Sequence, residues 1–348
     1  MLKLTEAAIL QQSNSELVLD EITLPEKLLK GQVLVELITS GICGAQINEI
    51  DAVKGVDKFL PHLLGHEGVG IVLEIGKNVK HIKIGDRVVM HWRPGNGIQS
   101  ETYKYLWRNK DLNSGWVTTF SQHAVVSENR LTPISKSLNS PHIPLLGCGL
   151  TTVFGSLENE VSLRLGDSVL ILGVGAVGSL SIIASKLKGA GEIVAIDKNS
   201  DKSELAKSCG ADIFYAINSS NSNEIIQEIV GGGRFFDLVI DTTGDAILMS
   251  KSYEMLSKTG TLLIIGVMPK EQKLSINTLD LNMGKKIIGT QGGRSLPQVD
   301  VPKLVMAIEN NVIPLGGLFY KERNLGEINT SIKEVRDGIP FKQYIKMT

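Results

Sequence analysis

The sequence contains little cysteine: only Cys43, Cys148 and Cys209 occur among 348 residues. An odd number of widely spaced cysteines argues against a disulfide framework. Cys209 lies in KSCGAD, a segment typical of a helix end and the turn after it. We therefore interpret Cys209 as a buried and chemically inert thiol.

Long apolar runs and a charge excess are also missing. No stretch of 18 or more apolar residues is present to span a bilayer, and the first 17 residues lack the unbroken apolar core of a secretory signal. The formal net charge is −1, and no basic patch indicates a nucleic acid or a membrane as partner. With 42% hydrophobic residues, the chain is predicted to be a globular, cytoplasmic protein that is long enough for two domains.

The second half of the chain alternates predicted strands and helices. Short apolar runs typical of buried parallel strands occur at 168–172, 192–196, 213–217, 237–241, 261–266 and 286–289. Between them, helical apolar spacing occurs at 176–188, 201–208, 223–230 and 246–257. This alternation predicts a doubly wound α/β sheet with a ligand crevice at its switch point.

The first 140 residues have a different pattern, with short strands, frequent glycine and little helical periodicity. Strands are predicted at 32–38 and 68–75, and turns at 76–78 and 85–86. The pattern favours a barrel-like β domain. Two helical patterns follow near the end of the chain, at 301–310 and 326–337.

A glycine-rich fingerprint, VLILGVGAVG, runs from a predicted strand through a turn into a helix at 169–178. Gly173 permits the tight turn, Gly175 lets the backbone approach a pyrophosphate, and Gly178 permits close packing of helix on strand. The helix N-terminus, at Ala176 and Val177, faces the phosphate charge. This arrangement is typical of a dinucleotide site.

Asp197 ends the next predicted strand, where an acid accepts hydrogen bonds from ribose hydroxyls and repels a 2′-phosphate. The cofactor is therefore predicted to be NAD. Lys198 leaves NADP as an alternative, because a cation beside the acid tolerates the phosphate.

Three residues far apart in the chain are of types that hold a catalytic zinc. Cys43 lies in GICG, His66 in GHEGVG and Cys148 in LGCGLTT. Two thiolates and an imidazole, with a fourth position open to water or substrate, are a known catalytic zinc set. A Lewis-acidic metal beside a hydride carrier can oxidise alcohols or reduce carbonyls.

The order of these motifs, with GDRVV at 85–89 between the second and the third, resembles the zinc-dependent medium-chain dehydrogenases/reductases, the family of alcohol, polyol and threonine dehydrogenases. The resemblance extends from Val33 to Lys342. It implies an α/β fold with a chaperonin-10-like β-barrel catalytic domain at 1–149 and 293–348, and a doubly wound Rossmann NAD-binding domain at 150–292. It also implies a homodimer or homotetramer, paired through the sheet edge near 274–289.

The resemblance also implies roles for individual residues. One zinc ion would be held by Cys43, His66 and Cys148, and the carbon bearing the metal-bound oxygen would exchange a hydride with the nicotinamide. The other implied site residues are Glu67 as a transient zinc ligand, Thr152 against the nicotinamide, Trp92 at the catalytic cleft, Lys202 at the ribose, Lys342 at the pyrophosphate, and Thr243 and Gly266 around the cofactor. Each of three residues has an alternative interpretation. Glu67 could be a buried acid that holds its loop, Lys202 could be a solvated lysine, and Trp92 could belong to an aromatic surface lobe used for subunit contact.

The sequence departs from the family pattern at Ala45 and Gln46, where the family has a hydroxyl residue and then aspartate. Ala45 cannot carry the proton of the alcohol towards solvent. Gln46 could accept the second N–H of His66 through its amide oxygen but brings no charge, which would leave the metal more electrophilic. Glu67, His91, a water chain and a substrate hydroxyl all stay open as the proton route.

A second departure is the stretch 90–114, which lacks the four close cysteines of a structural zinc site, so one catalytic ion is expected. Arg93, Asn96 and Gln99 in this stretch are candidates to reach a polar substrate. We therefore predict a zinc- and NAD-dependent dehydrogenase of the EC 1.1.1 type for a polar secondary alcohol or ketone, such as a polyol, cyclitol or sugar derivative. A metal-free NAD(P)H reductase of the same superfamily and a catalytically silent nucleotide-binding protein are the alternatives.

Overall fold

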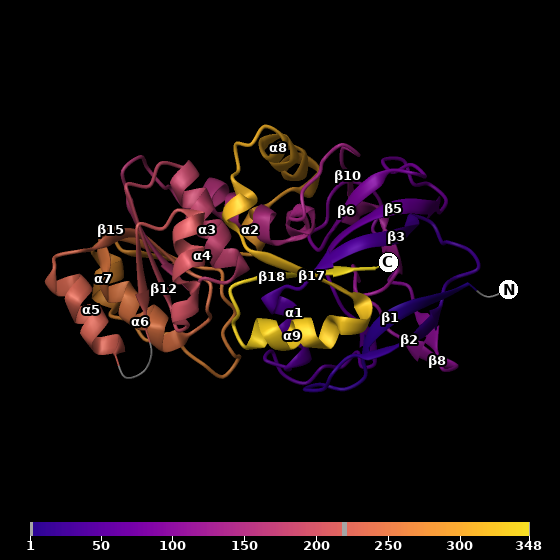
Figure 1. Ribbon diagram of the computed structural model, residues 1–348, viewed down its shortest axis with the longest axis horizontal. Coiled ribbons are helices and arrows are strands. Elements are labelled where there is room, and N and C mark those ends of the chain that lie inside the picture. Colours follow the sequence, from indigo (N-terminus) through magenta and orange to yellow (C-terminus); the bar gives the residue numbers. More distant parts are fainter. Residues whose placement is uncertain (1–2, 218–220, 348) are drawn as a thin grey trace.

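A computed structural model describes residues 3–217 and 221–347 of the chain, and within them the strands form three sheets. Figure 1 shows two of the sheets at the N-terminal end of the molecule and the third at the other end, with the C-terminal segment between them. The outermost residues of the predicted catalytic segments, Met1, Leu2 and Thr348, lie outside the described part.

The N-terminal part is built from short strands, as the sequence predicts. A sheet in the order β4-β1-β2-β7-β8 packs beside a sheet in which β10-β6-β5-β3-β18-β17 follow one another and β9 pairs with β3. The strands are β1 Leu4–Leu10, β2 Val18–Thr23, β3 Gln32–Gly41, β4 His62–Leu63, β5 Glu67–Ile75, β6 Arg87–His91, β7 Tyr105–Trp107, β8 Lys110–Leu112, β9 His123–Ser127 and β10 Leu131–Pro133. Helix α1 Gly44–Ile50 belongs to this region, whereas α2 Gly149–Asn159 leads out of it and packs against α3 Ala176–Leu187.

The third sheet is parallel and has the strand order β13-β12-β11-β14-β15-β16. This is the doubly wound topology that the alternation of strands and helices predicts. The strands are β11 Ser168–Leu172, β12 Glu192–Asp197, β13 Ile213–Ala216, β14 Phe236–Asp241, β15 Leu256–Ile264 and β16 Lys286–Gly289. The helices are α3 Ala176–Leu187, α4 Ser203–Cys209, α5 Ser222–Gly231, α6 Ala246–Glu254 and α7 Thr278–Asn282.

The central strand β11 shows why this sheet is stable. Val169 and Ile171 belong to the apolar core on one face of the sheet, whereas Leu170 and Leu172 belong to the core on the other face. Successive side chains of a strand point to opposite faces, so a continuous apolar run is what a strand covered on both faces requires.

Two boundaries in this region differ from the prediction. The helix expected at 246–257 ends at Glu254, and the strand expected at 261–266 begins at Leu256 and ends at Ile264. Leu256 pairs with Phe236, and the register of β15 on β14 then shifts before Leu238 pairs with Thr261. The apolar periodicity of the sequence could not predict this irregularity, because the bulged residues of the strand follow no regular alternation.

The C-terminal segment returns to the first part of the chain. It forms α8 Pro297–Glu309, β17 Tyr320–Asn324, α9 Ile328–Arg336 and β18 Lys342–Lys346. Strand β18 pairs antiparallel with β3 and parallel with β17, and Figure 1 shows it beside the N-terminal strands. Lys342 is thereby brought close to the end of β3, where Ile42 and Cys43 follow.

Cys209 is buried, as the sequence predicts for an inert thiol. None of the helices in residues 3–217 and 221–347 combines the length and the apolar character that crossing a membrane requires.

Candidate active site

Three separate elements bring the predicted zinc ligands together. Cys43 follows β3 and is the N-cap residue of α1, His66 directly precedes β5, and Cys148 is the N-cap residue of α2. Gly65, next to His66, has a φ of +94°, and a Cβ at this position would lie 2.8 Å from the Phe120 ring. Only glycine therefore lets the chain approach this closely and still present His66.

The ligand atoms of Cys43, His66, Glu67 and Cys148 all lie within 4.8 Å of one another. The Nε2 atom of His66 is buried and has no hydrogen-bond partner. A buried polar atom without a partner is costly unless a ligand uses it. Because two sulfurs, an imidazole nitrogen and a carboxylate oxygen are donors that zinc accepts in catalytic sites, the residues present fit this ion.

Electrostatic coupling favours the thiolate form of one ligand. Hydrogen bonding from the Cys148 thiol holds the pKa of Cys43 well below its usual value, and His66 acts in the same direction. Burial lowers the pKa of His66, but the neighbouring Cys43 thiolate outweighs this effect and raises the pKa overall. A cysteine thiolate is the form that binds a metal.

Glu67 forms an ion pair with Lys342 in which both side chains are buried. Lys342 Nζ donates to Glu67 Oε2 at 2.6 Å and to the carbonyl of Ile42 at 2.8 Å. The side chain of Glu67 is only 1% exposed and that of Lys342 only 2%. Burial raises the pKa of Glu67, although the Lys342 ammonium opposes the shift. We call Cys43, His66, Glu67 and Cys148 the metal-type cluster. The resemblance implies a place at the pyrophosphate for Lys342, and its bond to Glu67 links it to this cluster.

The amide of Gln46 faces His66 in an unexpected orientation. Its Nε2 lies 2.8 Å from His66 Nδ1 and 3.1 Å from Glu49 Oε2, while its Oε1 accepts a hydrogen bond from the backbone N–H of Gly65. The expectation that the amide oxygen would serve His66 is therefore wrong. Gly65 needs an acceptor and Glu49 needs a donor, and together they fix which end of the amide points at the imidazole.

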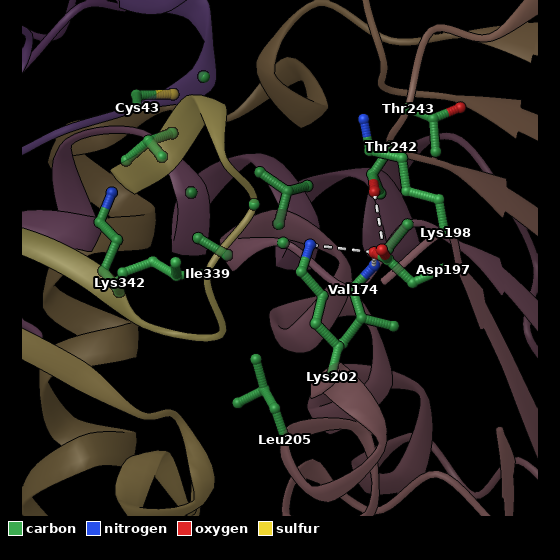
Figure 2. A pocket seen from close by; sticks show the side chains of 18 of the residues that line it. Cys43, Val174, Asp197, Lys198, Lys202, Leu205, Thr242, Thr243, Ile339 and Lys342 are labelled. Atoms are coloured by element: carbon green, nitrogen blue, oxygen red, sulfur yellow. Dashed lines mark hydrogen bonds and ion pairs between the residues drawn. The ribbon is translucent and has the colours of Figure 1, made fainter. Parts of the chain in front are cut away.

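A cavity of about 720 Å³ connects this cluster with the glycine fingerprint. Figure 2 shows Cys43 and Lys342 towards one end of the cavity, and Asp197 with Lys202 towards the other. The predicted site residues that line it are Cys43, Glu67, Gly173, Gly175, Ala176, Val177, Asp197, Lys198, Lys202, Thr243 and Lys342.

Asp197 is held by three donors of the protein. Its Oδ2 accepts from the backbone N–H of Val174 at 2.7 Å and from Lys202 Nζ at 3.1 Å, and its Oδ1 accepts from the backbone N–H of Asn199 at 2.9 Å. Lys202 is only 8% exposed, so the alternative of a solvated lysine is wrong. The carboxylate is thereby fixed directly beneath the fingerprint turn.

Six predicted residues lie outside the lining of this cavity, and two of them are the zinc-type ligands His66 and Cys148. A Cβ at Gly178 would meet the carbonyl of Gly173, which is the close helix–strand packing predicted for it. Gly266 approaches Asp241 and Gly244 at the ends of neighbouring strands. Thr152 is buried in the first turn of α2, and Trp92 packs against Gly292.

Two residues near Trp92 are less available than the sequence suggests. Arg93 donates to the carbonyls of Gln291 at 2.6 Å and Ser295 at 2.8 Å, so its guanidinium is engaged by the backbone. His91 is 1% exposed, with Nδ1 2.7 Å from the carbonyl of Arg93 and Nε2 2.9 Å from Thr132 Oγ1. Because both ring nitrogens are engaged, His91 is a structural residue and not a proton route.

Sequence reasoning missed several residues around the cleft. Gly338, Ile339 and Phe341 line the large cavity from the C-terminal segment. A second cavity of about 580 Å³ shares Thr243 and Asp245 with the first and is also lined by Asn48, Gln272 and Lys273. No motif marks these residues, because Asn48 of α1 and the loop residues are brought together only by the fold.

Comparison with known proteins identifies both halves of this arrangement. Residues 29–136 match the alcohol dehydrogenase GroES-like domain, and residues 176–310 match the zinc-binding dehydrogenase family. The chain is 28% identical over 346 residues to the S-(hydroxymethyl)glutathione dehydrogenase of Synechocystis sp., covering 91% of this chain and 92% of that protein.

Solved structures give the same result. The crystal structure of benzyl alcohol dehydrogenase from Acinetobacter calcoaceticus matches with a TM-score of 0.86 and 26% identity, covering 100% of both chains. An alcohol dehydrogenase zinc-binding domain protein from Burkholderia ambifaria shares the fold, with a TM-score of 0.86 at 24% identity and 100% coverage of both chains. The matched domains and the full-length similarity show that this chain belongs to the zinc-dependent medium-chain alcohol dehydrogenase family, oxidoreductases of the EC 1.1.1 type.

Proposed function

We propose that the protein is a zinc- and NAD-dependent dehydrogenase that interconverts a polar secondary alcohol and the corresponding ketone. The observation that carries the proposal is a single cavity. Cys43 and Glu67 of the metal-type cluster line the same cavity as the glycine fingerprint and Asp197. A hydride can pass directly between substrate and cofactor only when both sites share one enclosed space.

When bound, a zinc ion would supply Lewis acidity that polarises the oxygen of the substrate. Cys43, His66 and Cys148 would hold it, and His66 offers its unpartnered Nε2 for this purpose. Glu67 stands beside these ligands, and its bond to Lys342 limits how far the carboxylate can move. We propose one such ion per chain.

The cofactor assignment rests on the cleft around Asp197. Its carboxylate lies at the end of β12, and the ammonium of Lys202 and two backbone N–H groups hold it in place. An acid fixed here favours the free ribose hydroxyls of NAD over the 2′-phosphate of NADP. We propose Gly173, Gly175, Ala176 and Val177 as the pyrophosphate site, and Thr152, Thr243 and Gly266 as residues around the nicotinamide half.

A polar substrate is supported by the second cavity. Asn48, Gln272 and Lys273 line it, and it adjoins the first cavity at Thr243 and Asp245. A Cβ built at Gly44, beside Cys43, would meet no atom within 4 Å, so space is open there as well. Hydroxyl groups of a polyol, cyclitol or sugar derivative would find hydrogen-bond partners here. Trp92, in the stretch 90–114, would form a further side of the cleft.

We further propose that residues 1–149 and 293–348 work as the catalytic domain and 150–292 as the NAD-binding domain. The pairing of β18 with β3 supports this division. We also propose a homodimer or homotetramer that pairs through the outer strand β16, and sedimentation of the purified chain tests this.

The proposed function is tested with protein purified without chelators. About one zinc per chain, quenching of NADH fluorescence on binding, and faster NAD reduction with polyols than with hexanol are the expected results. Absence of zinc combined with carbonyl reduction would instead indicate the metal-free reductase. Zinc and NADH binding without turnover of any alcohol or carbonyl in a broad panel would indicate a silent nucleotide-binding protein.

A further inference from the structure

Asn199 connects the two walls of the cofactor cleft. Its side-chain Nδ2 donates to the carbonyl of Gly338 at 3.1 Å. Asn199 follows β12 of the parallel sheet, whereas Gly338 belongs to the C-terminal segment that continues into β18. Residues 139 positions apart are thus joined across the rim of the cavity that contains the proposed NAD site.

Both partners of this bond are held in place by their own local structure. Asn199 is the N-cap residue of the short helix Ser200–Lys202, and its Oδ1 accepts from the backbone N–H of Asp201 at 3.0 Å. Its backbone N–H donates to Asp197 Oδ1. One residue therefore fixes the ribose-binding acid, caps the turn that carries Lys202, and reaches across the cleft.

Gly338 is equally constrained. It has a φ of +70° and follows the C-cap residue of α9. Its N–H bonds to the carbonyl of Val335, and the N–H of Ile339 bonds to that of Glu334, which is the hydrogen-bond pattern of a Schellman motif. The carbonyl of Gly338 is accordingly presented in a fixed direction at the end of a helix.

The residues that follow Gly338 form the second wall. Ile339, Phe341 and Lys342 line the cavity opposite Asp197, and Figure 2 shows Ile339 and Lys342 on that side. A Cβ at Gly338 would lie 3.9 Å from Lys202 Nζ, so the two walls already approach each other closely at this point.

We propose that Asn199 is a positioning residue that closes the cofactor cleft, holding the wall of Gly338 to Lys342 against the dinucleotide by its bond to Gly338. The inference rests on the proposed function, because it presumes that NAD(H) occupies this cleft. A ligand that spans both walls depends on the bond, whereas a ligand confined to the Asp197 end does not. Because product release or opening of a closed site limits turnover in many enzymes, the bond would also set the rate of NADH release.

Asn199→Ser separates the two functions of the side chain. Serine is neutral and keeps an oxygen that can cap the backbone N–H of Asp201, but it is too short to reach Gly338. Asn199→Ala removes the cap and the cross-cleft bond together. The pair therefore distinguishes closure of the cleft from local support of the Asp197 turn.

The experiment measures binding of NADH and of AMP to the zinc-loaded full-length chain and both variants, by fluorescence and by calorimetry. We expect Asn199→Ser to weaken NADH binding about fivefold and to speed NADH dissociation by a similar factor, with AMP binding unchanged, since loss of one hydrogen bond has about this effect. Asn199→Ala should weaken both ligands.

Unchanged NADH affinity in Asn199→Ser would overturn the inference, and so would equal weakening of NADH and AMP, which would indicate a purely local role. Urea unfolding of both variants checks that they fold. If the unsubstituted chain bound neither NADH nor NADPH, the proposed function itself would fail, and that outcome is distinguished by the first titration.

Discussion

The side-chain amide nitrogen of Gln46 lies 2.8 Å from Nδ1 of His66, whose Nε2 is buried without a hydrogen-bond partner. A histidine that binds a metal through Nε2 normally donates its Nδ1–H to an acceptor. Gln46 presents a donor instead, because its oxygen is used by Gly65 and its nitrogen by Glu49. Metal binding at His66 therefore requires Gln46 to reorient or to give up this contact.

Gln46→Glu should strengthen zinc binding by about tenfold, because the new carboxylate keeps the acceptor for Gly65 and offers a second oxygen to His66 Nδ1–H. Competition with a chromophoric zinc chelator measures the affinity. Adding Glu49→Gln should raise it further, since the substitution removes the repulsion between two neighbouring carboxylates. An affinity equal to or below that of the unsubstituted protein in both variants would contradict this account.

Lys342→Met should destabilise the fold by about 3 to 5 kcal/mol, because it leaves the carboxylate of Glu67 buried without a partner. Urea denaturation measures the free energy of unfolding. The double variant Lys342→Met with Glu67→Gln should recover a large part of the loss, since no uncompensated charge remains. If the double variant were no more stable than Lys342→Met alone, the ion pair would not be the cause.

The buried His91 should make the protein sensitive to mild acid. Burial lowers the pKa of His91 to about 4, below its ordinary value of 6.5, so the unfolded chain binds a proton that the folded chain refuses between these pH values. The free energy of unfolding is therefore unaffected by this residue above pH 6.5 and decreases as the pH falls towards 4. The loss amounts to about 2 kcal/mol at pH 5.

Unfolding by urea at pH 7 and pH 5 tests the contribution of His91. His91→Gln should be less stable than the unsubstituted protein at pH 7 and should lose less stability between the two pH values. An identical pH dependence in both proteins would show that other groups dominate.

Arg130 should hold the stretch 93–116 in place. It donates to Gln99 Oε1 at 2.6 Å and 3.1 Å and to the carbonyl of Trp92, and its guanidinium lies 4.6 Å from the centre of the Trp116 ring. Arg130→Met should therefore speed proteolytic cleavage within 93–116 several-fold, because the loop opens more often when these bonds are lost.

The matched control for Arg130 is Arg108→Met, which removes an exposed arginine that also lies over a tryptophan, Trp107, and pairs with Asp20. Its effect on cleavage within 93–116 should be small, since an exposed ion pair contributes little. Equal acceleration in both variants would mean that any arginine lost near this stretch has the same effect.

Local patterns predicted much of the fold. The alternating apolar runs gave the six strands of the parallel sheet, because each run needed only to be covered on both faces. The start of β15 was missed, since it depends on a shift in register against β14. The tail was assigned to the first domain by resemblance alone, and the pairing of β18 with β3 supplies the physical basis.

The candidate site divides in the same way. The types and order of Cys43, His66 and Cys148 identify a zinc set from the sequence, because few residue types ligate this metal. The orientation of Gln46, the pairing of Lys342 with Glu67 and the engagement of Arg93 by backbone carbonyls were not predicted. Each depends on partners that are distant in the chain or on competition among several neighbours.

The sequence by itself determined the chemical groups available: two thiols, an imidazole, a carboxylate, a glycine turn and an acid after the next strand. These are properties of single residues and short segments, and they persist in any conformation. Only the tertiary structure decided which groups share a cavity and how their hydrogen bonds are distributed. Distances between remote segments are set by packing of the whole chain, and a hydrogen-bond donor turns to whichever acceptor that packing leaves within reach.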